Sequence, residues 1–182
     1  MPILKKGIVQ VYTGNGKGKT TAALGLALRM LGAGGRVYIC QFLKPAEQVG
    51  GEVISARQFA ENLTLERLEN NWDMRKSLSD EQEAERMRRA IIKKLGEIKQ
   101  LAQAGQYDMI VLDEIVFCLS KKLARWEDVA EIIEGRPGHV ELVLTGRGAD
   151  DKLIARADLV TEMQEVKHPY QQNIAARKGI EY

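Results

Sequence analysis

Several residue types that carry chemistry in other proteins are scarce in this chain of 182 residues. It has two cysteines and two histidines, and they are not clustered, so no zinc pattern of Cys and His ligands is present. Cys40 and Cys118 both lie inside apolar runs. We interpret each as a small buried hydrophobe and not as half of a disulfide. Nor does the sequence assemble a Ser–His or Cys–His pair for nucleophilic catalysis.

An excess of charge and long apolar runs are missing as well. The net charge is +2 and aromatic residues make up 5% of the chain, whereas a nucleic-acid partner calls for a basic track or stacking aromatics. No apolar run approaches the roughly 18 residues that cross a bilayer. The first residues, MPILKKGIVQVY, lack the long apolar region of a secretory signal. We therefore expect a cytoplasmic protein that binds neither nucleic acid nor a membrane.

Apolar strands alternate with helices along the chain. Strands are expected at 8–12, 37–42, 109–112, 140–145 and 159–163, and helices at 20–31, 79–105 and 126–134. The segment 53–72 mixes strand and helix signals and stays unassigned. Near-continuous apolar strands separated by helices predict an α/β fold with a mainly parallel central sheet flanked by helices. The length and the lack of repeats or linkers predict a single domain over residues 1–182.

The long helix expected at 79–105 has clear local signals. Ser79 and Gln82 have the spacing of a capping box. The run DEQEAERMRRAIIKK predicts a solvated face with i,i+4 ion pairs. Apolar residues one turn apart form a single stripe, which consists of Met87, Ile91, Leu95, Ile98 and Leu101 or Ala102. The pattern predicts an amphipathic helix with one buried face.

The stretch TGNGKGKTT connects the first expected strand to the first expected helix. Gly14, Gly16 and Gly18 can take positive φ, so backbone N–H groups can turn toward phosphate oxygens. The helix N-terminus adds unpaired N–H groups and a positive dipole end. Lys19 can reach the β- and γ-phosphates, and the Thr20 hydroxyl can bind Mg²⁺. The candidate nucleotide-binding residues of the loop are Gly14, Asn15, Gly16, Lys17, Gly18, Lys19, Thr20 and Thr21.

A turn that binds nothing is the alternative for this loop. We disfavour it because three glycines and two lysines at this junction have no evident packing rationale. The stretch does depart from the usual G-x-x-x-x-G-K-S/T pattern, since Thr13 stands at its first position.

A pair of carboxylates supplies the second element. Asp113 and Glu114 follow the apolar residues MIVL, and the carboxyl end of a buried strand faces the crevice where open α/β sheets bind ligands. These carboxylates can hold Mg²⁺ directly or through water; the alternative is that they cap the next segment. Loop and carboxylates together predict a nucleoside triphosphate with Mg²⁺, but they leave the reaction open.

The whole set of segments is more specific than either element. From Gly7 onward it comprises TGNGKGKTTAALGLALRMLGAGGRV, VLDEI, RPGHVELVLTGRGAD, ADLVTEM, VKH and KGIEY. In this order the segments resemble the ATP:corrinoid adenosyltransferases. The resemblance implies a three-layer P-loop NTPase (RecA-like) fold. It also implies transfer of the 5′-deoxyadenosyl group of ATP to the Co(I) centre of a reduced corrinoid, with release of triphosphate, in adenosylcobalamin synthesis or salvage.

The same resemblance suggests roles for individual residues. Lys17, Lys19 and the loop amides would neutralise the leaving triphosphate. Lys19, Thr20 and Glu114 are the candidate catalytic residues, and Thr20, Asp113 and Glu114 the candidate Mg²⁺ ligands. A P-loop ATPase that acts as a nucleotide-dependent switch is the alternative function.

The residues that would contact the corrinoid, and those at the edge of the nucleotide site, give weaker signals in the sequence. Trp72 matches the bulky aromatic residues that relatives place near the lower face of cobalt. The alternative is that Trp72 is a half-buried core residue. Asn70 stands where a second aromatic residue is expected. Arg147 can reach phosphate or form a salt bridge. His168 matches a family segment and can lie near the site, although a lone histidine is usually structural.

The resemblance also implies protein partners, and it raises the question of which segment covers the nucleotide site. Relatives form homodimers, and a reduced flavoprotein is the implied electron donor. Several relatives carry a helical extension before the first strand, whereas six residues precede Gly7 here. Either the site stays more open or another segment covers it.

Overall fold

The computed structural model describes residues 2–44, 50–68 and 80–182, and a parallel sheet forms the centre of this described part. Its six strands lie in the order β3-β2-β4-β5-β1-β6. They are β1 (Val9–Thr13), β2 (Val37–Gln41), β3 (Leu63–Arg67), β4 (Met109–Asp113), β5 (Glu141–Thr145) and β6 (Leu159–Glu162). Each residue of β2, β4 and β5 is buried, as the continuous apolar runs of these segments require in a sheet covered on both faces.

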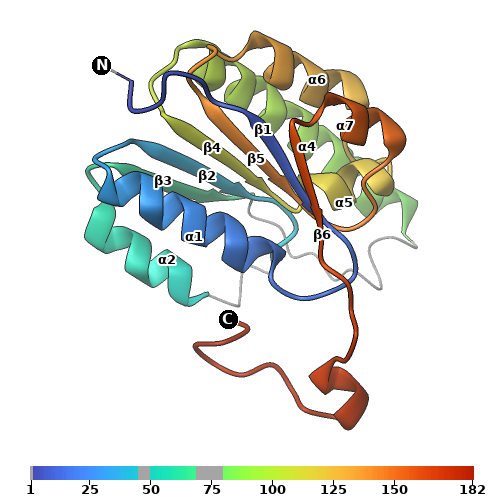
Figure 1. Cartoon of the computed structure of the whole chain (residues 1–182). Coiled ribbons are helices and arrows are strands. Elements are labelled where there is room, and N and C mark those ends of the chain that lie inside the picture. The colour runs from blue at the N-terminus through green and yellow to red at the C-terminus, as the bar shows by residue number, and fades with distance from the viewer. Residues whose placement is uncertain (1, 45–49, 69–79) are drawn as a thin grey trace.

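Helices cover the two faces of this sheet (Figure 1). Helices α1 and α2 lie on one face, and α4, α5, α6 and α7 lie on the other. Their bounds are Lys19–Gly32 for α1, Gly51–Ala56 for α2, Glu81–Gln103 for α4, Ile115–Ser120 for α5, Trp126–Gly135 for α6 and Asp151–Arg156 for α7. Short 3-10 turns occupy Arg57–Phe59 and Pro169–Gln172.

Two apolar layers result from the alternation of side chains along the strands. Ile39 and Val111 point to the side of α1, where they join a core with Ala27. Cys40 and Leu112 point to the opposite side, into the larger core that contains α4 and α6 residues. The three-layer α/β arrangement predicted from the sequence is therefore confirmed. Both cysteines are free, fully buried thiols.

Helix α4 follows the predicted stripe but differs from it in two details. Its buried face contains Ala84, Met87, Ile91, Leu95, Ile98 and Ala102. Asp80 caps the helix, because its side chain accepts the N–H groups of Gln82 and Glu83 at 2.9 and 3.3 Å; Ser79 lies outside the described residues. Three of the described ion pairs within this helix are spaced i,i+3, as between Lys94 and Glu97, and one, between Glu81 and Arg88, is spaced i,i+7; none of them has the expected i,i+4 spacing. Spacings of three and four residues both put side chains on one face of a helix.

The segment left unassigned, 53–72, contributes an edge strand. Its described part contains most of α2, a 3-10 turn and β3, which pairs in parallel with β2. The five residues of β3 are half buried. Glu66 and Arg67 give it no continuous apolar run, which is why its sequence predicts a strand poorly.

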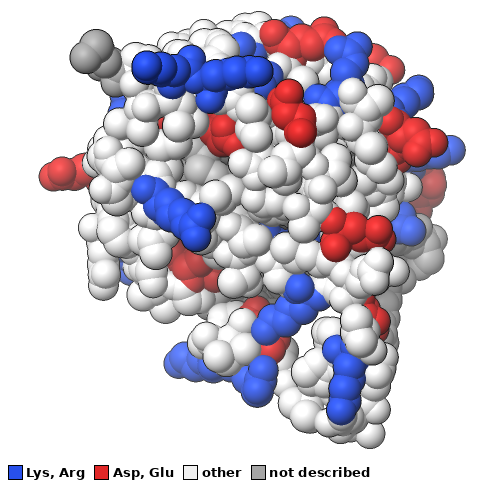
Figure 2. Space-filling view, in the orientation of Figure 1, with Lys and Arg blue, Asp and Glu red and all other residues white. Residues whose placement is uncertain are grey.

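Because the strands are parallel, their carboxyl ends share one edge of the sheet. The loop from β1 to α1 lies at this edge, and the chain after β6 descends past it and turns back toward it (Figure 1). Lys, Arg, Asp and Glu side chains are interspersed on the face seen in Figure 2. Within the described ranges, no helix is long and apolar enough to span a membrane.

Candidate functional site

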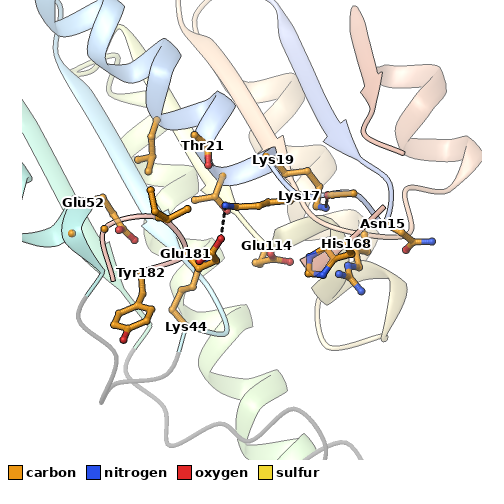
Figure 3. A pocket seen from close by; sticks show the side chains of 18 of the residues that line it. Asn15, Lys17, Lys19, Thr21, Lys44, Glu52, Glu114, His168, Glu181 and Tyr182 are labelled. Carbon is orange, nitrogen blue, oxygen red and sulfur yellow. Dashed lines mark hydrogen bonds and ion pairs between the residues drawn. The ribbon is translucent and has the colours of Figure 1, made fainter. Parts of the chain in front are cut away.

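A cavity of about 660 Å³ opens where the β1–α1 loop meets the carboxyl edge of the sheet (Figure 3). The loop supplies much of its lining, and segments distant in sequence supply the rest. The lining residues outside the loop are Leu24, Lys44, Gly51, Glu52, Ser55, Glu114, Arg147, His168, Gly179, Ile180, Glu181 and Tyr182. The cavity thus brings together the β1–α1 loop, the end of β4 and the last residues of the chain.

The loop is shaped by its glycines. Gly14 and Gly18 have φ angles of 93° and 116°, in the region that favours glycine. Gly16 is needed for a different reason: its N–H donates to the Met163 carbonyl at 2.6 Å, and a Cβ at Gly16 would lie 2.6 Å from the Gln164 carbonyl oxygen. The expectation that these glycines have no packing rationale is therefore wrong, since the loop packs against the chain that follows β6.

Lys19 lies inside the loop that precedes it. Its side chain is buried, and Nζ donates to the carbonyls of Gly14 and Gly16 at 2.8 and 2.7 Å. Burial lowers the pKa of Lys19, because it removes water from the charged form. Two main-chain carbonyls of the loop therefore hold the Lys19 amine in place.

Asp113 joins three elements beneath the loop. Its Oδ1 accepts hydrogen bonds from the hydroxyls of Thr20 at 2.8 Å and Thr145 at 2.6 Å. Its Oδ2 accepts one from Gln41 at 3.3 Å and lies 3.7 Å from Lys44 Nζ. The carboxylate is 1% exposed, so these donors offset the cost of burying it. The start of α1 is thereby tied to the ends of β4, β5 and β2.

Glu114 is placed differently from its neighbour. Its φ is +69°, which is unusual for a residue with a side chain, and its N–H donates to Thr145 at 3.0 Å. It occupies the N-cap position of α5 without making a side-chain cap, which goes against the capping alternative. The carboxylate forms no hydrogen bond or ion pair with another described residue and lines the cavity. Burial, followed by the charge of Asp113, raises the pKa of Glu114.

The donor set at this point suits a hard cation. Thr20 and Glu114 line the cavity and offer a hydroxyl and a carboxylate, and the carboxylate of Asp113 lies buried directly behind Thr20, whose hydroxyl donates to it. In the described ranges no cluster of three or more His, Cys, Asp or Glu side chains could hold a metal by itself. Such a set fits Mg²⁺, which is usually held by one or two carboxylates, with phosphates and water as the remaining ligands.

The other candidate residues are distributed around the same cavity. Asn15, Lys17, Thr21 and Arg147 all line it. Arg147 is exposed and makes no ion pair in the described part of the chain, which disfavours the salt-bridge alternative. Trp72 lies outside the described residues.

Some lining residues had no part in the sequence predictions. Lys44 follows β2, and its place could have been inferred because β2 ends at the same edge of the sheet as β4. His168, by contrast, was expected from its family segment to lie near the site; it lines the cavity, and its Nδ1 accepts the N–H of Tyr170 at 3.2 Å. The closing residues KGIEY gave no signal of their position, since exposed polar turns have no periodic pattern.

The fold and this loop together define a P-loop α/β protein. The KaiC-like protein PH0186 of Pyrococcus horikoshii has a similar fold, with a TM-score of 0.55 over 89% of this chain and 74% of that one. At 14% sequence identity, this likeness concerns the fold alone.

The family follows from the sequence comparisons. The family model "ATP:corrinoid adenosyltransferase BtuR/CobO/CobP" matches residues 5–182. The corrinoid adenosyltransferase of Pseudomonas aeruginosa is 33% identical over 180 residues, which cover 98% of this chain and 85% of that protein. Corrinoid adenosyltransferase CobA of Salmonella typhimurium is 33% identical over 184 residues, 98% of this chain and 87% of that protein. This chain belongs to the ATP:corrinoid adenosyltransferase family.

The contact between the loop and the chain after β6 can be tested at Gly16. We expect Gly16→Ala to lower the free energy of unfolding by about 1–3 kcal/mol, because its Cβ would meet the carbonyls of Met163 and Gln164. Urea unfolding measures the change. Gly25→Ala, in α1 with open space around its Cβ position, is the control, and we expect it to raise stability by roughly 0.5–1 kcal/mol. Unchanged stability in Gly16→Ala would contradict this packing.

A second prediction concerns the buried charge of Glu114. A carboxyl whose pKa is higher in the folded chain binds more protons there, so the free energy of unfolding falls as the pH rises through the window above its ordinary value of 4.5. We therefore expect Glu114→Gln to be more stable than the parent at pH 7, with the difference closing below about pH 4.5. Urea unfolding across this range checks it. Glu61→Gln, at an exposed position, should show no such gain; an equal gain there would count against the assignment.

Proposed function

We propose that this chain transfers the 5′-deoxyadenosyl group of ATP to the Co(I) centre of a reduced corrinoid and releases triphosphate. The observation that carries the proposal is the family match over residues 5–182. The cavity supports it, because its cationic loop and its carboxylates lie side by side at the carboxyl edge of the sheet.

The proposed reaction needs no nucleophile from the protein. The Co(I) electron pair of the corrinoid substrate forms the bond to the 5′ carbon, and the bond from that carbon to the α-phosphate oxygen breaks. Its electrons leave with triphosphate. The protein has to orient the 5′ carbon and stabilise the negative charge on the leaving group. A site rich in lysine, threonine and main-chain N–H groups suits these two tasks.

We assign the triphosphate to the loop. Lys19 Nζ, which now donates to two loop carbonyls, would donate to phosphate oxygens instead. Lys17 and Arg147, which both line the cavity, would add positive charge. The remaining contacts would come from main-chain N–H groups and side chains of the loop residues Gly14, Asn15, Gly18 and Thr21.

We assign Mg²⁺ to the Thr20 hydroxyl and to the carboxylates of Asp113 and Glu114. When bound, Mg²⁺ would neutralise part of the charge on the phosphates. Asp113 would also keep Thr20 oriented, through the 2.8 Å hydrogen bond between them. Glu114, whose carboxylate lines the cavity and has no hydrogen-bond or ion-pair partner among the described residues, would face the ligand directly.

The family also supports several finer proposals. We propose that residues 1–182 act as one domain and form a cytoplasmic homodimer, and that a reduced flavoprotein supplies electrons to cobalt. Trp72 would lie near the lower face of the corrinoid.

The proposed reaction makes a clear prediction about products. Mg-ATP is supplied with or without a chemically reduced corrinoid, the phosphate products are identified by ³¹P NMR, and the corrin absorbance is followed. We expect triphosphate in an amount equal to the adenosylated corrinoid, and only when Co(I) is present. Orthophosphate released without corrinoid would contradict the proposal and favour a nucleotide-dependent switch.

The matched variants for this assay are two lysines. Lys19→Ala should lower the rate of triphosphate formation by about 100-fold or more, as expected for loss of a donor to a developing charge. Lys93→Ala, on the exposed side of α4, should retain the parental rate.

A further inference from the structure

The end of the chain forms a compact turn against the loop. Within it, the N–H of Gly179 donates to the Tyr182 carbonyl at 2.6 Å, and the N–H of Glu181 donates to the Arg177 carbonyl at 2.9 Å. Gly179 to Tyr182 line the same cavity as the β1–α1 loop. We call residues 177–182 the closing turn. It therefore borders the cavity to which we assign the triphosphate.

One ion pair joins the closing turn to the loop. Lys17 Nζ lies 2.8 Å from Glu181 Oε1 (Figure 3). Within the part of the chain that the structure describes, this is the one hydrogen bond or ion pair between residues 165–182 and the rest. Residues 165–182 are also exposed, apart from the half-buried His168. A single exposed ion pair stabilises little, so the position of the closing turn depends on a weak contact.

Glu181 depends less on this ion pair than Lys17 does. Arg177 also donates to both carboxylate oxygens of Glu181, from its backbone N–H and its guanidinium, at 2.7 to 3.2 Å. These hydrogen bonds lower the pKa of Glu181, so it stays ionised. If Lys17 is withdrawn, Glu181 keeps Arg177 as a partner. Lys17, in contrast, has no other hydrogen bond or ion pair with a described residue.

The ionised carboxylate of Glu181 would repel the proposed ligand, triphosphate. Charged side chains of both signs gather where the last part of the chain meets the body of the protein (Figure 2). A triphosphate in the loop would carry several negative charges close to Glu181, and like charges repel. It would also attract Lys17, whose side chain is 44% exposed and hence free to turn.

We propose that Glu181 is a positioning residue that competes with triphosphate for Lys17. In the empty site Glu181 holds Lys17 at the cavity; on binding, triphosphate takes Lys17 and the closing turn moves away. After adenosyl transfer, Glu181 recaptures Lys17 and favours release of the product. The inference rests on the proposed function, because it takes triphosphate as the leaving group.

Binding of inorganic tripolyphosphate tests the competition without corrinoid or turnover. Titration calorimetry is performed on the full chain at low and at moderate salt. We expect Glu181→Gln to bind tripolyphosphate about two- to five-fold more tightly than the parent at low salt, the range of an exposed ion pair. The gain should shrink as salt screens the charges. Glu181→Asp, which keeps the charge, should stay close to the parent.

Two further variants separate this role from a general effect of charge. Glu165→Gln removes the same charge from the same exposed segment at a residue that does not line the cavity, and should bind like the parent. In a Lys17→Gln background the gain from Glu181→Gln should vanish. Equal or weaker binding by Glu181→Gln, an equal gain in Glu165→Gln, or a gain that persists without Lys17 would each overturn the inference.

The product assay distinguishes a failure of this inference from a failure of the proposed function. If Glu181 does not compete for Lys17, triphosphate still forms only with Co(I) corrinoid. If the proposed function fails, orthophosphate appears in place of triphosphate whatever residue stands at position 181.

Discussion

The buried carboxylate of Asp113 is the constraint on which the site depends. Two hydroxyl groups, from Thr20 and Thr145, donate to the same oxygen. A carboxylate with 1% exposure would be very unfavourable without such donors. Because one donor belongs to the first turn of α1 and the other to the end of β5, the carboxylate fixes where the helix begins relative to the sheet. The position of the β1–α1 loop follows from that.

The site contains ionisable side chains whose charged forms are disfavoured by burial. The pKa of Lys19 is lowered and that of Glu114 is raised, in each case mainly by burial. Glu114 also adopts a left-handed backbone conformation. Strain and buried charge of this kind cluster at functional sites, where they hold groups ready for a ligand. A polyanion with a divalent cation would supply the oppositely charged partners that Lys19 and Glu114 lack among the described residues, so the same features that cost stability would favour binding.

The sequence was informative where a pattern repeats or a motif has a fixed mechanism. Near-continuous apolar runs predicted the buried parallel strands, and the spacing of Met87, Ile91 and Leu95 predicted the buried face of α4. The lysine and threonine of the loop were singled out from the glycine-rich motif, and the carboxylates after β4 from their position at the end of a strand.

Contacts between exposed segments that lie far apart in the chain could not be predicted from the sequence. Gly16 is glycine because the chain after β6, about 150 residues later in the sequence, approaches its Cα, and nothing local signals this. Strand β3 stayed unassigned because its segment mixes strand and helix signals, and Glu66 and Arg67 leave the edge strand without a continuous apolar run. The meeting of Lys17 with Glu181 depends on how the last residues fold back, and a polar turn has no periodicity from which to infer it.

A crystal structure of the full chain with ATP and Mg²⁺ tests most directly whether this loop holds the triphosphate. We expect all three phosphates inside the Thr13–Thr21 loop, with Lys19 Nζ about 2.7–3.2 Å from a phosphate oxygen and the 5′ carbon open to the cavity. A structure in which ATP lies elsewhere, while Lys19 still donates to the carbonyls of Gly14 and Gly16, would contradict it.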